Sequence, residues 1–134
     1  MDSAVVSELA IRNLIATMAH LTDGGDLESY RAALDRDARW VMPGVAPVTG
    51  RDAIVEAARA RRAAGTTGPG SGTRHIVSTT AVEVDGRTAR SVSYWQFLAD
   101  IAGTPVLRAT GIYRDTFRQS EAGWVFAERV SAIE

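Results

Sequence analysis

The chain has 134 residues, of which 46% are hydrophobic and 23% charged, the size and composition of one ordinary globular domain. Its formal net charge is −1, so charge gives no case for binding nucleic acid or an anionic membrane. Every basic residue is arginine and there is no cysteine, which excludes a Schiff-base lysine, disulfides and thiolate metal sites.

The N-terminal segment carries no targeting signal in this sequence. It has neither a basic stretch nor an apolar run, and no segment approaches the roughly 20 apolar residues of a membrane span. We therefore expect a soluble, cytoplasmic protein with no membrane partner.

The first predicted element is a helix that ends at Gly24-Gly25. Glycine accepts the left-handed conformation that a helix C-cap requires, and Asp2 or Ser3 can cap the other end. Apolar residues recur at spacings of three to five, which predicts one buried face. That face comprises Val5, Val6, Leu9, Leu14, Met18 and Leu21.

Two further helices and a short strand are expected before residue 73. Asp26 caps a second helix that continues through Leu34, and the polar run 35–37 separates it from a strand at 38–42. A third helix covers about 51–64, and we expect its arginines to face solvent. The glycine-rich segment 65–72 lacks the Gly-Lys-Ser/Thr ending of a phosphate loop and precedes a strand, so nucleotide binding is excluded.

The second half of the chain predicts four long antiparallel strands. They cover Thr73 to Val84, Arg87 to Leu98, Val106 to Arg118 and Trp124 to Ile133, and Asp85-Gly86 between the first two is a strong hairpin signal. Helices followed by antiparallel strands predict an α+β fold. We expect one domain over residues 1–134, with three N-terminal helices packed on a strongly curved sheet that encloses a central, cone-shaped pocket.

Asp23 and His75 are the candidate catalytic pair. His75 opens the first long strand and Asp23 ends the first helix, so they meet if the helices fold back over the sheet. Imidazole has a pKa near 6.5, which lets it take and give a proton near neutrality, and a carboxylate partner would fix its tautomer. A carboxylate at the negative end of a helix dipole also indicates a compensating partner. The alternatives are a solvent-facing or core histidine and a polar helix-end residue.

Other polar and aromatic side chains are candidates for a binding pocket. His20 shares a helix face with Asp23 and is a backup, while Asp115 is expected to be a structural partner of an arginine. Tyr94 and Trp95 point to opposite faces of their strand, so at most one lines a cavity. Arg129 either holds a substrate oxygen or pairs with a buried carboxylate. The candidate substrate-binding residues are Met18, Trp40, Tyr94, Trp95, Tyr113 and Arg129.

Several short runs along nearly the whole chain carry a family resemblance. They are Ile11-Arg12-Asn13-Leu14-Ile15, the segment Leu21 to Leu27, Asp37-Ala38-Arg39-Trp40, Gly50-Arg51-Asp52-Ala53-Ile54, His75 leading to Val84-Asp85-Gly86, and Gly123-Trp124 followed by Arg129. Together they resemble the SnoaL-like domains of the nuclear-transport-factor-2-like superfamily, which implies a cone-shaped α+β fold.

The resemblance also implies a range of activities. The superfamily includes polyketide cyclases, scytalone and bile-acid dehydratases, ketosteroid isomerase, epoxide hydrolases, dioxygenase small subunits and non-catalytic proteins, so fold does not choose among them. In the dehydratase branch an Asp ending the first helix and a His opening the first long strand form an acid–base dyad, which Asp23 and His75 match. This sequence departs from that branch at Met18, where a tyrosine is expected, and lacks a second pocket histidine.

Our leading hypothesis is a cofactor-independent and metal-independent enzyme that uses His75 as base, oriented by Asp23. It would cyclise, isomerise or dehydrate a hydrophobic polyketide-like or polycyclic molecule. The alternatives are an epoxide hydrolase, a non-catalytic small-molecule-binding or assembly module, and a dioxygenase small subunit. We expect a homodimer formed through the outer face of the sheet.

Overall fold

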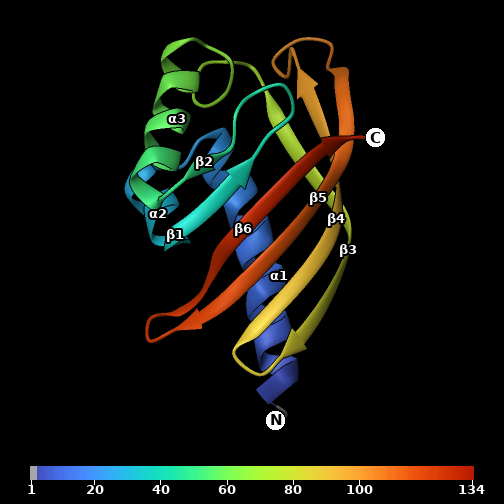
Figure 1. The fold of residues 1–134 in the computed structure, drawn as a ribbon. Helices are drawn as coiled ribbons and strands as arrows, with labels where there is room; N and C mark the ends of the chain where they lie inside the picture. The colour runs from blue at the N-terminus through green and yellow to red at the C-terminus, as the bar shows by residue number, and fades with distance from the viewer. Residues whose placement is uncertain (1–2) are drawn as a thin grey trace.

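The computed structural model describes residues 3–134, which form helices and one mixed sheet (Figure 1). The elements are α1 (Ser3–Asp23), α2 (Leu27–Ala32), β1 (Leu34–Val41), β2 (Val48–Thr49), α3 (Arg51–Ala63), β3 (Arg74–Asp85), β4 (Thr88–Ala99), β5 (Val106–Ser120) and β6 (Gly123–Ile133). The proposed Asp2 cap lies outside the described residues. The order of three helices before four long strands is confirmed.

The six strands form one sheet in the order β2-β1-β6-β5-β4-β3. Each neighbouring pair is antiparallel except β1 and β6, which are parallel. In Figure 1 α1 runs behind the sheet, while α2 and α3 lie beside its β1 and β2 end. The two-residue strand β2 was not expected, since it is too short to show a period-2 pattern. The strong curvature expected of the sheet stays a prediction.

The boundary between α2 and β1 differs from the expectation. The helix ends at Ala32 rather than Leu34, and the polar run 35–37 lies within β1 instead of separating two elements. The register against β6 shifts between Leu34 and Arg39, which marks an irregular strand. Polar residues are accommodated there because Asp35 pairs with Arg118 on β5.

The β3–β4 hairpin also differs in detail. Asp85 pairs with Thr88, so the two turn residues are Gly86 and Arg87, and only Gly86 has a positive φ, of 62°. Glycine at the first turn position is the requirement of a type II′ turn, whereas Asp-Gly at both central positions would have given type I′. The strand limits therefore follow the prediction to within one residue.

Helix α1 packs on the sheet through one face, from Ile11 onward. Ile11, Ile15, Met18 and Leu21 are buried, whereas Val5, Val6 and Leu9 are exposed. Val5, Val6 and Leu9 lie on the opposite face of the helix, and in Figure 1 the first turn of α1 projects past the β3–β4 hairpin. By length and composition α1 could cross a membrane, which corrects the expectation that no segment approaches a span. In this fold Ile11, Ile15, Met18 and Leu21 of α1 pack in the protein core instead.

The outer face of the sheet carries exposed apolar side chains. Ile76 on β3 and Val92 and Tyr94 on β4 all lie on this face. The homodimer expected through this face stays a prediction.

Candidate functional site

The C-terminal turn of α1 is held in place by Arg62 of α3. One guanidinium nitrogen, Nη2, donates to the carbonyl oxygens of Leu21 at 2.6 Å and Gly25 at 2.7 Å. A cation at this end also offsets the negative pole of the helix dipole. Arg62 is thus partly buried and structural, which corrects the expectation of a solvated arginine face. The contact fixes the turn that carries Asp23.

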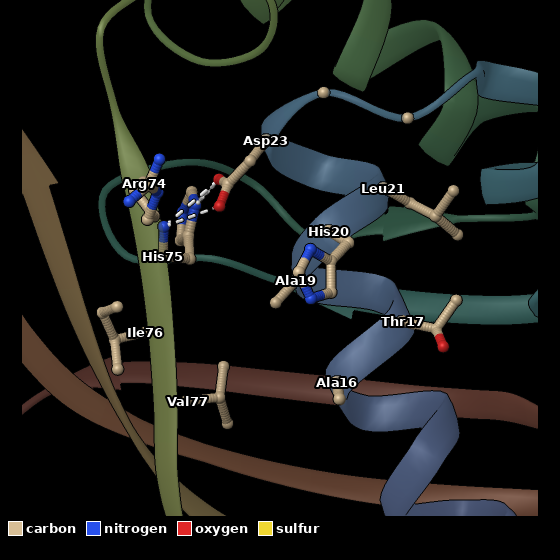
Figure 2. Close-up of a pocket in the computed structure, with 12 residues that line it drawn as sticks. Ala16, Thr17, Ala19, His20, Leu21, Asp23, Arg74, His75, Ile76 and Val77 are labelled. Carbon is tan, nitrogen blue, oxygen red and sulfur yellow. Dashed lines mark hydrogen bonds and ion pairs between the residues drawn. The ribbon is translucent and has the colours of Figure 1, made fainter. Parts of the chain in front are cut away.

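Asp23 and His75 are brought together by this turn and the start of β3. The carboxylate Oδ1 lies 2.7 Å from Nδ1 of the imidazole, and the backbone N–H of His75 donates to Oδ1 and Oδ2 at 3.2 and 3.0 Å (Figure 2). The Asp23 and His75 side chains are 20% and 13% exposed. The carboxylate therefore has the compensating partner that its position on the helix demands, and it fixes the orientation of the ring.

This arrangement determines which nitrogen of the His75 ring carries the proton and which one can accept a hydrogen bond. Because a carboxylate only accepts, Nδ1 carries the proton that is donated to Asp23, and neutral His75 then has Nε2 as an acceptor. In the described part of the chain no side chain or backbone group forms a hydrogen bond with Nε2. Nε2 is the nitrogen available to a ligand.

His75 borders two separate spaces. A groove of about 750 Å³ lies between α1 and β3, and Figure 2 shows the residues that line it, among them Ala16, His20 and Val77. An inner cavity of about 150 Å³ lies between the sheet and the loops that follow β1 and α3. It is lined by Met42, Pro43, Thr67, His75, Trp95, Phe97, Ala109, Tyr113 and Ser131.

The geometry of the ring indicates that Nε2 faces the inner cavity. The two ring nitrogens flank Cε1 and their outward directions diverge, so a ring with Nδ1 toward Asp23 directs Nε2 away from Asp23. The centroids of the His75 and Phe97 rings are 4.9 Å apart, and Phe97 lines the inner cavity only. The groove contains Asp23 and is the less suitable place for a reacting atom.

Only some of the predicted substrate-binding residues line the inner cavity. Trp95 and Tyr113 line it. Tyr94 does not, because it is 47% exposed on the outer face, whereas Trp95 is 7% exposed, as strand alternation requires. Met18 is fully buried in the core, and Trp40 lines a separate cavity of about 160 Å³ beside α3. Tyr94, Met18 and Trp40 therefore do not line the inner cavity, and their substrate-binding role stays a prediction.

Arg129 is paired with Asp115 and does not line the inner cavity. Its Nε and Nη2 donate to the two carboxylate oxygens at 2.9 and 3.0 Å, and its guanidinium lies 3.7 Å from the ring centre of Tyr113. Burial lowers the pKa of Arg129, but the Asp115 carboxylate outweighs this effect and raises it. Burial raises the pKa of Asp115, and the charge of Arg129 and the hydrogen bonds that it donates oppose this rise and favour the carboxylate form. The expected arginine partner of Asp115 is confirmed.

Some lining residues were not predicted. Phe97 and Ser131 lie two residues beyond Trp95 and Arg129 on their strands, so the period-2 pattern placed them on the same inner face. Thr67 comes from the loop after α3, whose path is fixed by contacts distant in sequence. Nothing in the local sequence indicates that residue. His20 lines the groove only, with no side-chain hydrogen bond to Asp23 or His75 among residues 3–134.

The family profile described as SnoaL-like domain matches residues 3–130. The chain belongs to the SnoaL-like domain family. Its structure is similar to that of a nuclear-transport-factor-2-like protein with a cystatin-like fold from Novosphingobium aromaticivorans. That chain is 28% identical, with a TM-score of 0.82, and the match covers 96% of this chain and 82% of that one.

Two more distant structures share the fold. A candidate dehydratase from Streptomyces avermitilis is 15% identical over 98% of this SnoaL-like domain and 99% of its own chain, with a TM-score of 0.82. A candidate scytalone dehydratase from Novosphingobium aromaticivorans is 21% identical over 97% and 85%, with a TM-score of 0.79. No curated protein matches the sequence significantly. Among the described residues of this SnoaL-like domain, no group of three or more His, Asp or Glu side chains could hold a metal ion.

Two buried tyrosines predict a loss of stability of the SnoaL-like domain in alkali. Burial raises the pKa of Tyr30 and of Tyr113 above 10. Above about pH 10 the unfolded chain therefore loses protons that the folded protein keeps, and the free energy of unfolding falls by up to about 1.4 kcal/mol per pH unit for each tyrosine. Urea unfolding between about pH 9 and 11.5 measures this slope. Tyr113→Phe should reduce the slope of the free energy of unfolding against pH by about half. An unchanged slope in the double variant Tyr30→Phe and Tyr113→Phe would contradict the prediction.

Proposed function

We propose that this SnoaL-like domain is a cofactor-independent enzyme that transfers a proton by general acid–base catalysis at His75. The observation that carries the proposal is the 2.7 Å contact between Asp23 Oδ1 and His75 Nδ1, which leaves Nε2 free at the wall of a cavity. A carboxylate that holds the imidazole in one tautomer and stabilises the imidazolium makes it a better base.

The reaction class follows from the surroundings of His75. The inner cavity presents mainly apolar groups, such as Phe97, Met42 and Ala109, so it suits a hydrophobic substrate. Nε2 would remove a proton from the carbon next to a carbonyl, and the electron pair of that C–H bond would form an enolate. The imidazolium would then return the proton to another carbon in an isomerisation, or to a departing hydroxyl, released as water, in a dehydration. A carbon electrophile in the same molecule would give cyclisation.

The similar structures support dehydration among these outcomes. Candidate dehydratases occur twice among them, although at 15% and 21% identity they share only the fold with this chain. We therefore propose a lyase or isomerase acting on a polyketide-like or related cyclic ketone. An epoxide hydrolase is less well supported, because His75 rather than a free carboxylate borders the inner cavity.

Deuterium exchange tests the proposal without knowledge of the product. Enolisable cyclic ketones, beginning with cyclohexanone, 3-hydroxycyclohexanone and 1-tetralone, are incubated in D₂O and deuterium uptake next to the carbonyl is followed by mass spectrometry. We expect exchange that depends on wild-type protein and is lost in His75→Gln. His20→Gln is the matched control, because His20 lies on the neighbouring groove. Equal exchange in wild type and His75→Gln for every ketone would refute the assignment.

A further inference from the structure

Two hydrogen-bonding atoms beside the inner cavity have no partner. Trp95 Nε1 and Ser131 Oγ are closed to solvent and form no hydrogen bond with any residue of the described chain. Their side chains are 7% and 5% exposed, and both line the cavity next to His75. A buried donor without an acceptor costs about 1–3 kcal/mol. Such a penalty in a native fold requires an explanation, and a ligand that supplies the acceptor is one.

The two donors belong to cross-strand pairs that lie next to each other on the inner face of the sheet. Trp95 lies opposite Gly111 on β5, and Ser131 lies opposite Tyr113, two residues along the same strand. A Cβ on Gly111 would come within 2.3 Å of Cζ2 and 2.4 Å of Cε2 of Trp95, so the indole lies flat on the backbone of this glycine. Nε1 is bonded to Cε2 and is therefore held at the level of the sheet, where a ligand oxygen reaches it once a neighbouring side chain moves aside.

We propose that Trp95 and Ser131 hold the carbonyl oxygen of the substrate, with the neighbouring C–H bond directed at Nε2 of His75. An indole N–H can only donate, so its partner must be an acceptor. The Ser131 hydroxyl turns toward the cavity by rotation about χ1. When the C–H bond breaks and its proton passes to Nε2, the electron pair moves into the enolate and negative charge develops on the oxygen that both groups face. Donors placed there stabilise that charge. The proposal rests on the proposed proton transfer.

The volume of the cavity limits the part of the substrate that reacts. About 150 Å³ is close to the volume that holds one benzene-sized molecule. We infer that the reacting part is a single six-membered cyclic ketone. A polycyclic molecule, as expected from the sequence, would place one ring in this space, which is open to solvent, and leave the others outside it.

A binding measurement tests the oxygen contact independently of catalysis. The protein has three tryptophans, so its ¹H–¹⁵N spectrum holds three indole N–H signals, and Trp95→Phe identifies that of Trp95. We expect cyclohexanone to shift the Trp95 signal downfield, and methylenecyclohexane, which has the same shape but no oxygen, to lack this effect. Equal shifts from the two compounds, or no shift of the Trp95 signal with cyclohexanone, would overturn the proposal.

Ser91 provides a matched control for the effect on rate. Its Oγ is also buried and unpartnered, but it does not line the inner cavity. We expect Ser131→Ala and Trp95→Phe to slow deuterium exchange by roughly 10- to 10³-fold, and Ser91→Ala to leave it unchanged. Ser131→Ala should not lower the free energy of unfolding, because no hydrogen bond is lost. If Ser131 were purely structural, the variant would instead be less stable and exchange deuterium at the wild-type rate.

The outcomes separate the two proposals. Normal exchange in Ser131→Ala and Trp95→Phe, with exchange lost in His75→Gln, would refute the oxygen-holding role and leave the acid–base assignment intact. If wild-type protein exchanges no ketone, the acid–base assignment is refuted, and the Trp95 signal then decides the oxygen contact alone.

Discussion

Asp115→Ala is expected to lower the free energy of unfolding by about 3–5 kcal/mol, because it leaves the Arg129 guanidinium buried without its carboxylate. Arg129 and Asp115 are 4% and 1% exposed, so water cannot replace the lost partner. The contact of Arg129 with the Tyr113 ring offsets only part of the loss, since a cation–π interaction contributes roughly 0.5–2 kcal/mol. Urea unfolding of wild type and variant at neutral pH measures the difference.

An ion pair on the outer face of the sheet serves as the control. Arg90 also donates two hydrogen bonds to one carboxylate, that of Glu83, at 2.9 and 2.7 Å, but both side chains are more than two-thirds exposed. Glu83→Ala should therefore change stability by less than about 1 kcal/mol. Replacing both buried partners, in Asp115→Leu with Arg129→Met, should restore much of the loss, because a buried pair contributes little beyond an apolar pair of similar volume. Equal effects of Asp115→Ala and Glu83→Ala would contradict the structural role of burial.

The fold could be predicted from the sequence where local signals agree with tertiary packing. Gly24-Gly25 ends α1 as predicted, and the backbone N–H of each glycine donates to His20 O, but neither glycine has the positive φ of the left-handed cap that was expected. Asp26 caps α2 by accepting from the Ser29 N–H at 2.8 Å. The prediction was wrong where distant contacts decide. The polar run 35–37 joins a strand because β6 lies beside it. Val5, Val6 and Leu9 stay exposed because they lie on the face of α1 opposite Ile11, Ile15 and Met18, so the predicted apolar stripe combined two faces.

In the candidate site, too, some features could be predicted from the sequence and others depend on contacts between distant residues. The meeting of Asp23 and His75 could be predicted, since a helix-end carboxylate lacks a local partner and the family resemblance pairs it with the first long strand. Sequence could not distinguish the two roles considered for Arg129, because both need a residue on the inner face of β6. Only the position of Asp115, opposite Arg129 across β5 and β6, decides for the ion pair. The unpaired atoms of Trp95 and Ser131 depend on what surrounds them, which no local pattern contains.

His75→Gln and Asp23→Asn are each expected to lower the rate of ketone exchange by about 10²–10⁴-fold. Glutamine removes the basic nitrogen. Asparagine removes the charge that stabilises the imidazolium, and its amide N–H₂ can donate to Nδ1, which would select the tautomer with Nε2 protonated and unable to act as base. The asparagine side chain retains an oxygen that accepts the backbone N–H of His75, so the contact between α1 and β3 persists and the protein should remain folded. Initial rates of deuterium uptake, with stability measured alongside, check the prediction.

The double variant shows whether the two side chains act as one unit. If Asp23 acts only through His75, then Asp23→Asn adds almost nothing to the loss already caused by His75→Gln, because effects within a catalytic unit are not additive. If Asp23 is itself the base, as a carboxylate beside the groove permits, Asp23→Asn abolishes exchange while His75→Gln retains part of it. Additive losses would mean that the two residues serve independent functions, and the 2.7 Å contact would then be structural. The Asp23→Asn variant thus distinguishes an orienting carboxylate from a catalytic one, which the distance between the two side chains alone does not.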